Sequence, residues 1–119
     1  MKKDDNIYLF HIRDSINLII EYTSNINFED FSNKRMVQDA VTKQFEIIGE
    51  ASSRLSEDFK DKHNHIPWKK IIGMRNKLIH DYLGVDVKVI WATVTQDISI
   101  FRKDILKIIE DSAPQLPLK

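Results

Sequence analysis

The sequence VQDAVTKQFEIIGEASSRLSEDF at residues 37–59 carries an apolar side chain at every third or fourth position. These apolar positions are Val37, Ala40, Val41, Phe45, Ile48, Ala51, Leu55 and Phe59. Steps of three and four are the period of an α-helix that buries one face. The pattern predicts one long helix from about Phe28 to Phe59. Asn27 and Asp30 resemble a capping box at its start, and Ser32 is the alternative cap.

A similar pattern precedes this helix and predicts another one, from about Asp5 to Thr23. Its apolar face is expected to consist of Ile12, Ile16, Ile19 and Ile20. The candidates for capping its first turn are Asp4, Asp5 and Asn6. The polar run at residues 24–27 separates the two helices.

The chain after residue 59 predicts a polar loop and two more helices. The loop is expected over residues 60–65, and Pro67 suits the first turn of the next helix, where its missing N–H costs nothing. Gly84 is placed to end that helix. Asp86 can cap the last helix, whose apolar positions continue to Ile108.

Four helices with short connections predict an all-α fold, an up-down antiparallel four-helix bundle. The length of 119 residues fits a single domain, which we assign to residues 1–111. The tail at residues 112–119 holds two of the three prolines and is expected to be frayed. Because glycine also numbers only three, a turn-rich all-β chain is not expected.

The composition excludes several functional classes. No cysteine is present, which excludes disulfides, thiolate nucleophiles and cysteine-ligated metals. The first residues lead into no long apolar stretch, and no apolar run approaches the roughly 20 residues that a membrane span needs. We therefore expect a cytoplasmic protein that does not contact a membrane.

The balanced total charge hides a basic block. Lys and Arg together number 18, and so do Asp and Glu, which by itself predicts no binding of a polyanion. Residues 60–80, however, contain six basic residues and one acid, whereas residues 1–59 contain seven basic residues and 11 acids. Two explanations of the basic block stay open: a solvated surface, or a site for a phosphate backbone.

Arg75 is predicted to lie near the centre of the apolar face of the third helix. At about 100° per residue, Trp68 and Ile72 fall within roughly 60° of it. A charged side chain is rarely buried without a partner. Three explanations stay open: the side chain reaches water, it pairs with a carboxylate such as Glu46 or Glu50, or the face is an interface or cleft that requires a guanidinium.

His80 lies about 140° from Arg75 on the same helical wheel, on the polar face. One ideal helix does not aim both side chains at the same point. If the two side chains act together, either the end of the helix is deformed, or a two-fold dimer brings the arginine and histidine of both chains to one cleft.

Gly49, inside the long helix, is expected to permit a close contact with another helix. A histidine pair at residues 63 and 65 is expected to contact RNA or solvent rather than a metal.

The octapeptide RNKLIHDY, from Arg75 to Tyr82, resembles the Arg–polar–x3–His motif of the HEPN superfamily of helical ribonucleases. With its final tyrosine it is similar to the Arg-x4-His-x-Tyr pattern of the HepT-like toxin branch. The sequences QFEIIGEA at 44–51, IPW at 66–68 and GVD at 84–86 are also similar to that branch. The resemblance covers nearly the whole chain except the tail.

This resemblance implies a dimeric, metal-independent endoribonuclease that acts as a toxin and needs no cofactor. Arg75 and His80 would be catalytic, with Asn76 and Asp81 as supporting members of the motif. The partner would be a minimal nucleotidyltransferase antitoxin that transfers AMP to Tyr82. The candidates for binding RNA are the basic side chains of Lys69, Lys70 and Lys77.

The chemistry that the resemblance implies is physically sensible. RNA carries its own nucleophile, the 2′-hydroxyl, and a histidine can move protons near neutral pH. An arginine can bind the phosphate and stabilise the charge of the transition state. Two rival explanations remain: a non-catalytic HEPN-type module that binds a nucleotidyltransferase, and a structural dimer in which Arg75 makes an ion pair.

Overall fold

A computed structural model describes residues 3–80 and 86–112 of the chain. The described residues form helices and contain no strand, which confirms the all-α class. The elements in chain order are α1 (Lys3–Thr23), α2 (Phe28–Asn33), α3 (Arg35–Arg54), α4 (Glu57–Lys62), α5 (Trp68–His80), α6 (Val87–Ala92), the π-helical segment η1 (Thr93–Asp97) and α7 (Ile98–Asp111).

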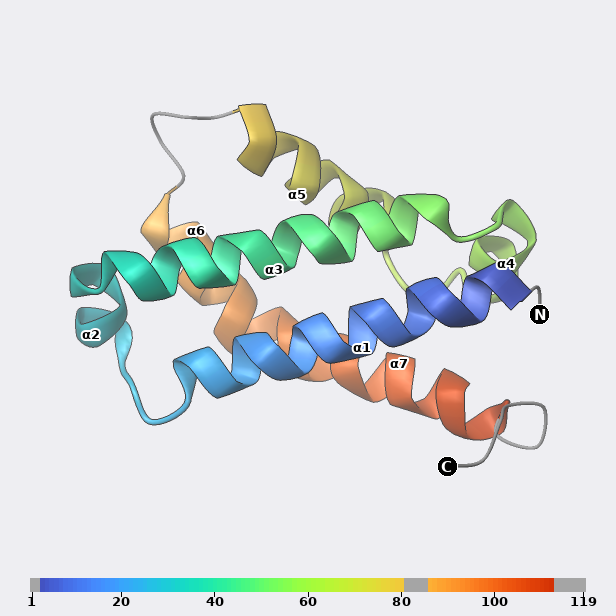
Figure 1. Cartoon of the computed structure of the whole chain (residues 1–119), viewed down its shortest axis with the longest axis horizontal. Coiled ribbons are helices and arrows are strands. Elements are labelled where there is room, and N and C mark those ends of the chain that lie inside the picture. The colour runs from blue at the N-terminus through green and yellow to red at the C-terminus, as the bar shows by residue number, and fades with distance from the viewer. Residues whose placement is uncertain (1–2, 81–85, 113–119) are drawn as a thin grey trace.

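Helix α3 packs along α1 on one side and along α5 on the other, so it is the central element of the face seen in Figure 1. The α6–η1–α7 segment runs behind α1 and α3, and the short helices α2 and α4 lie at opposite ends of α3. The buried core comes from all of these elements. Its fully enclosed side chains include Leu9, Ile12, Ile16, Ile19, Phe31, Val41 and Ile105.

The expected single helix from Phe28 to Phe59 is wrong, because the structure divides it into three helices. Lys34 separates α2 from α3 with a non-helical backbone at φ −116° and ψ 86°. The Asn27–Asp30 capping box is confirmed at the start of α2. Ser56 caps α4, its hydroxyl accepting from the backbone N–H of Phe59.

Two expectations at the ends of the helices also change. The loop expected over residues 60–65 is wrong in its first half, since α4 continues to Lys62. Asp5 lies in α1, and its carboxylate accepts hydrogen bonds from the backbone N–H (2.8 Å) and hydroxyl (2.7 Å) of Ser56. Asp5 is nearly fully buried, and its contact ties α1 to the start of α4.

The helix boundaries predicted around α1 and α6 are largely confirmed. The break at residues 24–27 is present, and Asn25 adopts a positive φ of 62° there. Asp86 caps α6 through the N–H of Lys88. Ile20, by contrast, was expected on the buried face and is 39% exposed. The end of α5 at Gly84 and the tail from residue 113 onward lie outside the described residues.

The last helix differs from a regular α-helix at η1. Thr93 and Thr95 donate their hydroxyl hydrogens to the carbonyls of Val89 and Trp91, four residues earlier. Such bonds compete with the backbone ladder and bend helices. Among the described residues, no helix is both long and apolar enough to cross a bilayer.

Candidate functional site

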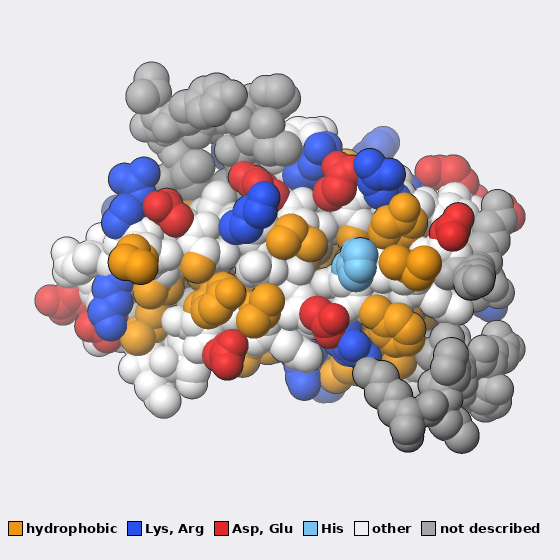
Figure 2. Space-filling view, viewed as in Figure 1, with side chains coloured by type: hydrophobic (Ala, Val, Ile, Leu, Met, Phe, Trp, Pro, Cys, Tyr) orange, Lys and Arg blue, Asp and Glu red, His pale blue; other side chains and the backbone are white. Residues whose placement is uncertain are grey.

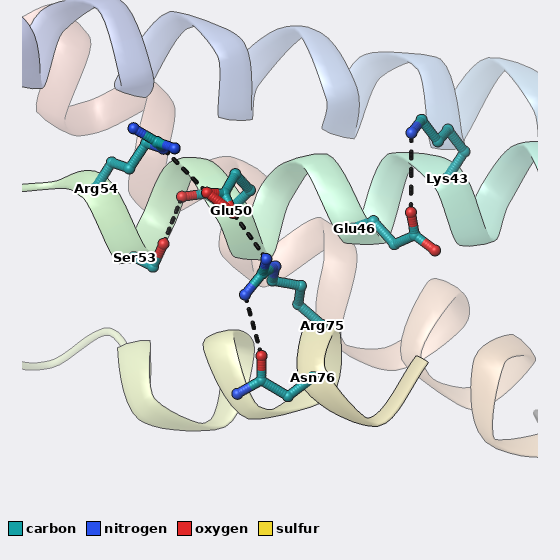
Figure 3. Close-up of polar contacts among 7 residues, drawn as sticks. All are labelled: Lys43, Glu46, Glu50, Ser53, Arg54, Arg75 and Asn76. Atoms are coloured by element: carbon teal, nitrogen blue, oxygen red, sulfur yellow. Dashed lines mark hydrogen bonds and ion pairs between the residues drawn. The ribbon is translucent and has the colours of Figure 1, made fainter. Parts of the chain in front are cut away.

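Arg75 points from α5 toward α3 and pairs with Glu50 there (Figure 3). The distance from its Nη2 to the Glu50 Oε1 is 2.9 Å. Its Nη1 donates to the Asn76 Oδ1 at 3.1 Å. Of the three explanations left open by the sequence, pairing with a carboxylate is therefore confirmed. Because the Arg75 side chain is still 29% exposed, its guanidinium also remains accessible from solvent.

The close packing of α5 on α3 at this point depends on Gly49. A Cβ added to Gly49 would overlap the Cβ of Arg75 and lie 2.9 Å from its Cγ. The expected role of Gly49 in a close helix contact is therefore confirmed. The stem of Arg75 lies against the α3 backbone, which leaves the guanidinium beside Glu50, one residue further along.

Glu50 also holds a second arginine. Its Oε2 accepts from the Nε of Arg54 at 3.0 Å, so one carboxylate joins a guanidinium from α3 to one from α5. Hydrogen bonding to Glu50, and after it to Tyr8, raises the pKa of the Arg54 guanidinium. Arg54 is thus fully charged at any physiological pH and is directed along α3 toward α1.

These side chains line a polar pocket of about 360 Å³ that α1, α3 and α5 share. Its lining consists of Tyr8, His11, Lys43, Glu46, Ile47, Glu50, Ala51, Arg54 and Arg75. Lys43 and Glu46 form a longer ion pair at 3.9 Å, also drawn in Figure 3. Basic and acidic side chains intermingle on the face shown in Figure 2. An anion would therefore be held by individual cations rather than by a uniformly basic surface.

Among the described side chains, Arg75 is the motif residue that lines the pocket, and Asn76 contacts Arg75 through its side-chain oxygen. His80 is the last residue of α5, and its side chain is outside the described part of the chain. Asp81 and Tyr82 lie outside the described residues altogether.

The three lysines predicted to bind RNA are exposed on α5. Lys69 and Lys77 do not line the polar pocket, and Lys70 lines a different, mainly apolar groove of about 160 Å³. That groove lies between α3, α5 and the η1–α7 segment, with Met74, Ile98 and other apolar side chains in its walls. The lysines and the two arginines of the pocket are therefore not gathered into one cluster.

His63 and His65 are neighbours at the turn after α4. Their ring centroids are 6.2 Å apart, and the His63 ring lies 4.7 Å from the ring of Phe59. Burial, and then the positive charge of Lys62, lower the pKa of His63 below its ordinary value. His63 thus behaves as an aromatic packing residue at neutral pH.

Sequence reasoning missed the contribution of α1 to the pocket. Tyr8 and His11 are one helical turn apart, and their rings meet edge to face at 6.3 Å. Their spacing places them on one face, but a spacing within α1 does not reveal which helix that face meets. The Glu50–Arg54 ion pair was easier to predict from the sequence, since a carboxylate and an arginine four residues apart on a helix are neighbours.

The comparisons with known proteins agree with the motif. A family model described as "HepT-like: Ribonuclease HepT-like" matches residues 12–109. "Probable ribonuclease HepT" of Thermococcus cleftensis is 50% identical over 98 residues, which cover 82% of this chain and 89% of that protein. "Putative RNase MJ1380" of Methanocaldococcus jannaschii is 39% identical over 104 residues, covering 87% of this chain and 95% of that protein.

A third relative is longer than this chain. "Gamma-glutamylcyclotransferase and putative RNase MJ0434" of Methanocaldococcus jannaschii is 48% identical over 111 residues, covering 93% of this chain but only 50% of that protein. No solved structure matches the chain. The match along most of the sequence confirms the resemblance carried by the RNKLIHDY motif: the chain belongs to the HepT-like ribonuclease family of the HEPN superfamily.

Proposed function

We propose that the chain is the toxin of a toxin–antitoxin pair, a metal-independent endoribonuclease that uses Arg75 and His80. The observation that carries this proposal is the placement of Arg75. Its guanidinium is oriented by Glu50 and Asn76, yet it stays partly exposed at a polar pocket. Two of its five N–H donors are used in these contacts, so others are available for a phosphate.

In this proposal the RNA supplies the nucleophile. The 2′-oxygen attacks the adjacent phosphorus as its proton is removed, and the bond to the 5′-oxygen breaks as that oxygen gains a proton. His80 serves as general acid or base in these transfers, because an imidazole exchanges protons near neutral pH. Arg75 stabilises the extra negative charge on the phosphate oxygens. The products are a 2′,3′-cyclic phosphate and a 5′-hydroxyl.

We further propose that a minimal nucleotidyltransferase antitoxin neutralises the chain at Tyr82. The phenol oxygen attacks the α-phosphorus of ATP, pyrophosphate leaves, and the phenol proton passes to solvent. An attached AMP adds a bulky anion seven residues beyond Arg75, on the same side of an ideal helix. It would exclude RNA by its volume and by its charge.

The proposed active form is a homodimer of up-down four-helix bundles, in which α1, α3, α5 and the α6–η1–α7 segment are the long members. The apolar groove between α5 and α7 supports this proposal, because Ile100 at its edge is 63% exposed. Lys70 and Asp104 on the groove can pair across a two-fold axis. An Ile100→Glu variant is expected to elute as a monomer and to lose cleavage.

The neutralisation step has its own test. Tyr82→Phe lacks the acceptor hydroxyl, so cells that produce this variant together with the nucleotidyltransferase are expected to die, whereas the parent chain is tolerated. Protection of cells that carry Tyr82→Phe would contradict AMP transfer to this residue. Intact mass of the parent chain, with and without the partner, provides the direct readout of one added AMP.

A further inference from the structure

We infer that the polar pocket of α1, α3 and α5 binds the nucleotide next to the cleaved phosphate, with Arg54 as phosphate ligand and Tyr8 as stacking surface. This inference rests on the proposed ribonuclease function and adds a substrate subsite to it. The motif in α5 supplies neither of these residues, since Tyr8 comes from α1 and Arg54 from α3. The ligand is a single-stranded RNA, whose bases are unpaired and free to stack.

Two guanidiniums already hold one anion in this pocket, the Glu50 carboxylate. The Oε1 of Glu50 lies 2.9 Å from the Nη2 of Arg75, and its Oε2 lies 3.0 Å from the Nε of Arg54. The two non-bridging oxygens of a phosphodiester resemble carboxylate oxygens in charge and geometry, and guanidinium binds both kinds of group in the same way. Arg54 and Arg75 therefore flank one anion, Glu50, and an RNA phosphate would bind the N–H donors that Glu50 leaves unused.

The two arginines have different freedom to receive an RNA phosphate. Arg75 is held at both Nη atoms and by its packing over Gly49, whereas Arg54 bonds Glu50 through its Nε and is also contacted by Tyr8. The Arg54 side chain is 59% exposed, twice the 29% of Arg75. Its Nη atoms can thus turn toward a phosphate while Nε keeps its bond to Glu50.

Two aromatic side chains of α1, Tyr8 and His11, also line the pocket. The Tyr8 ring is half-buried and fixed edge to face against His11, and both rings line the pocket beside Arg54. A preorganised ring next to a phosphate-binding cation is the arrangement that proteins use to hold single-stranded RNA, because every base offers a π-face. The pocket volume of about 360 Å³ leaves room for one base between α1 and α3.

The test measures binding of a short 2′-O-methyl RNA, which lacks the nucleophile and is not cleaved. Its dissociation constant is followed by fluorescence anisotropy across a salt series. Arg54→Gln is expected to weaken binding several-fold and to reduce the slope of log Kd against log salt by about 0.7, the value of one phosphate contact in single strands. Arg35→Gln is the matched control, because Arg35 is also in α3 and also bonds a carboxylate at 3.0 Å, but lies outside the pocket.

The tyrosine has a different expected signature. Tyr8→Leu is expected to weaken binding about tenfold with an unchanged salt slope, because stacking releases no counterions. Tyr8→Phe keeps the ring but loses the hydroxyl that contacts Arg54, so it is expected to bind more tightly than Tyr8→Leu. Tyr22→Leu controls for lost packing, since Tyr22 is a second partly buried tyrosine of α1 that does not line the pocket.

The outcomes separate this inference from the proposed function. If the parent cleaves RNA while Arg54→Gln and Tyr8→Leu bind with the parent's affinity and salt slope, the subsite is refuted and the ribonuclease proposal stands. If the parent neither cleaves nor binds RNA, both are refuted. Weaker binding by Arg54→Gln with the parent's salt slope would also overturn the role of Arg54 as a phosphate ligand.

Discussion

Gly49 and Arg75 occupy the same point of the α3–α5 contact: the space where a Gly49 side chain would begin is filled by the Arg75 stem. This relationship explains how an arginine can lie at the centre of an apolar helix face. The stem packs against backbone, and the guanidinium extends one residue further to Glu50. A small residue on one helix thereby positions a charged one on the next.

Gly49→Ala is expected to destabilise the protein by about 1–3 kcal/mol, because the added methyl group overlaps the root of a side chain and the helices must separate. Urea unfolding measures the change in the free energy of unfolding. The same variant should lose RNA cleavage, since moving α5 also moves Arg75.

Gly73→Ala is the control for this prediction. Gly73 also lies inside a helix, α5, but a Cβ there meets nothing within 4 Å. The better helix propensity of alanine should stabilise the protein by about 0.5–1 kcal/mol. Equal changes in the free energy of unfolding for Gly49→Ala and Gly73→Ala would contradict the close contact at Gly49.

Arg75→Ala is expected to abolish most RNA cleavage while the protein stays folded. The ion pair with Glu50 is partly exposed and contributes no more than about 1 kcal/mol to the free energy of unfolding, and loss of the stem packed on Gly49 adds to this. Loss of the guanidinium should slow cleavage by at least about 100-fold. Arg75→Lys should also cleave RNA slowly, because an ammonium cannot form the bidentate contact that a guanidinium makes with a phosphate.

A large loss of stability in Arg75→Ala together with full cleavage would reverse this interpretation. It would identify Arg75 as a structural ion-pair residue only. Arg35→Ala is the matched control, since it removes an exposed arginine from α3 and its pair with Asp39. It should change neither cleavage nor stability appreciably.

Asp5→Ala is expected to cost about 1–3 kcal/mol, because it leaves the Ser56 backbone N–H without its buried acceptor. Chemical unfolding and protease cleavage at α4 both report the loss. Asp4→Ala is the matched control, because Asp4 also lies in the first turn of α1 but is exposed. If both variants unfold at the same urea concentration, the Asp5–Ser56 contact contributes no stability.

His63 predicts how stability depends on pH. Burial against Phe59 lowers its pKa in the folded state, so the unfolded state binds a proton first as the pH falls. The free energy of unfolding should therefore be highest above about pH 6.5, the ordinary value for histidine, and decrease below it. Urea midpoints at pH 7.5 and 5.5 measure this effect, and His63→Gln should reduce the difference between them.

The groups around His63 act in both directions. Lys62 and His65 lower its pKa further, whereas Asp111 at the end of α7 raises it. An unchanged difference between the two pH values in His63→Gln would assign the pH dependence to other groups.

The helical period was sufficient to predict the helical class and most of the buried face, because apolar spacing reflects burial directly. It did not predict the breaks at Lys34 and Leu55. The apolar period continues across Leu55, whereas four polar residues separate Phe31 from Met36 around Lys34, and neither break is at a glycine or a proline. The break at Leu55 adjoins a tertiary contact, the bond between Asp5 and Ser56, 51 residues apart.

The site was predictable only in part for a related reason. The position of Arg75 on an apolar face left three explanations open, and the pair with Glu50 that the structure shows was among them. Nothing in the sequence indicated that α1 reaches the same pocket with Tyr8 and His11. Contacts between helices depend on how the helices pack, and the spacing within one helix contains no such information.

Arg75 and His80 are proposed to cleave RNA without a metal ion. The most direct test incubates the purified chain, produced without any nucleotidyltransferase and shown by intact mass to be unmodified, with RNA in excess EDTA. The parent chain is expected to produce 2′,3′-cyclic phosphate ends, and His80→Ala is expected to produce none. Cleavage by His80→Ala at the parent's rate, or no cleavage of cellular RNA by the folded parent, would contradict it.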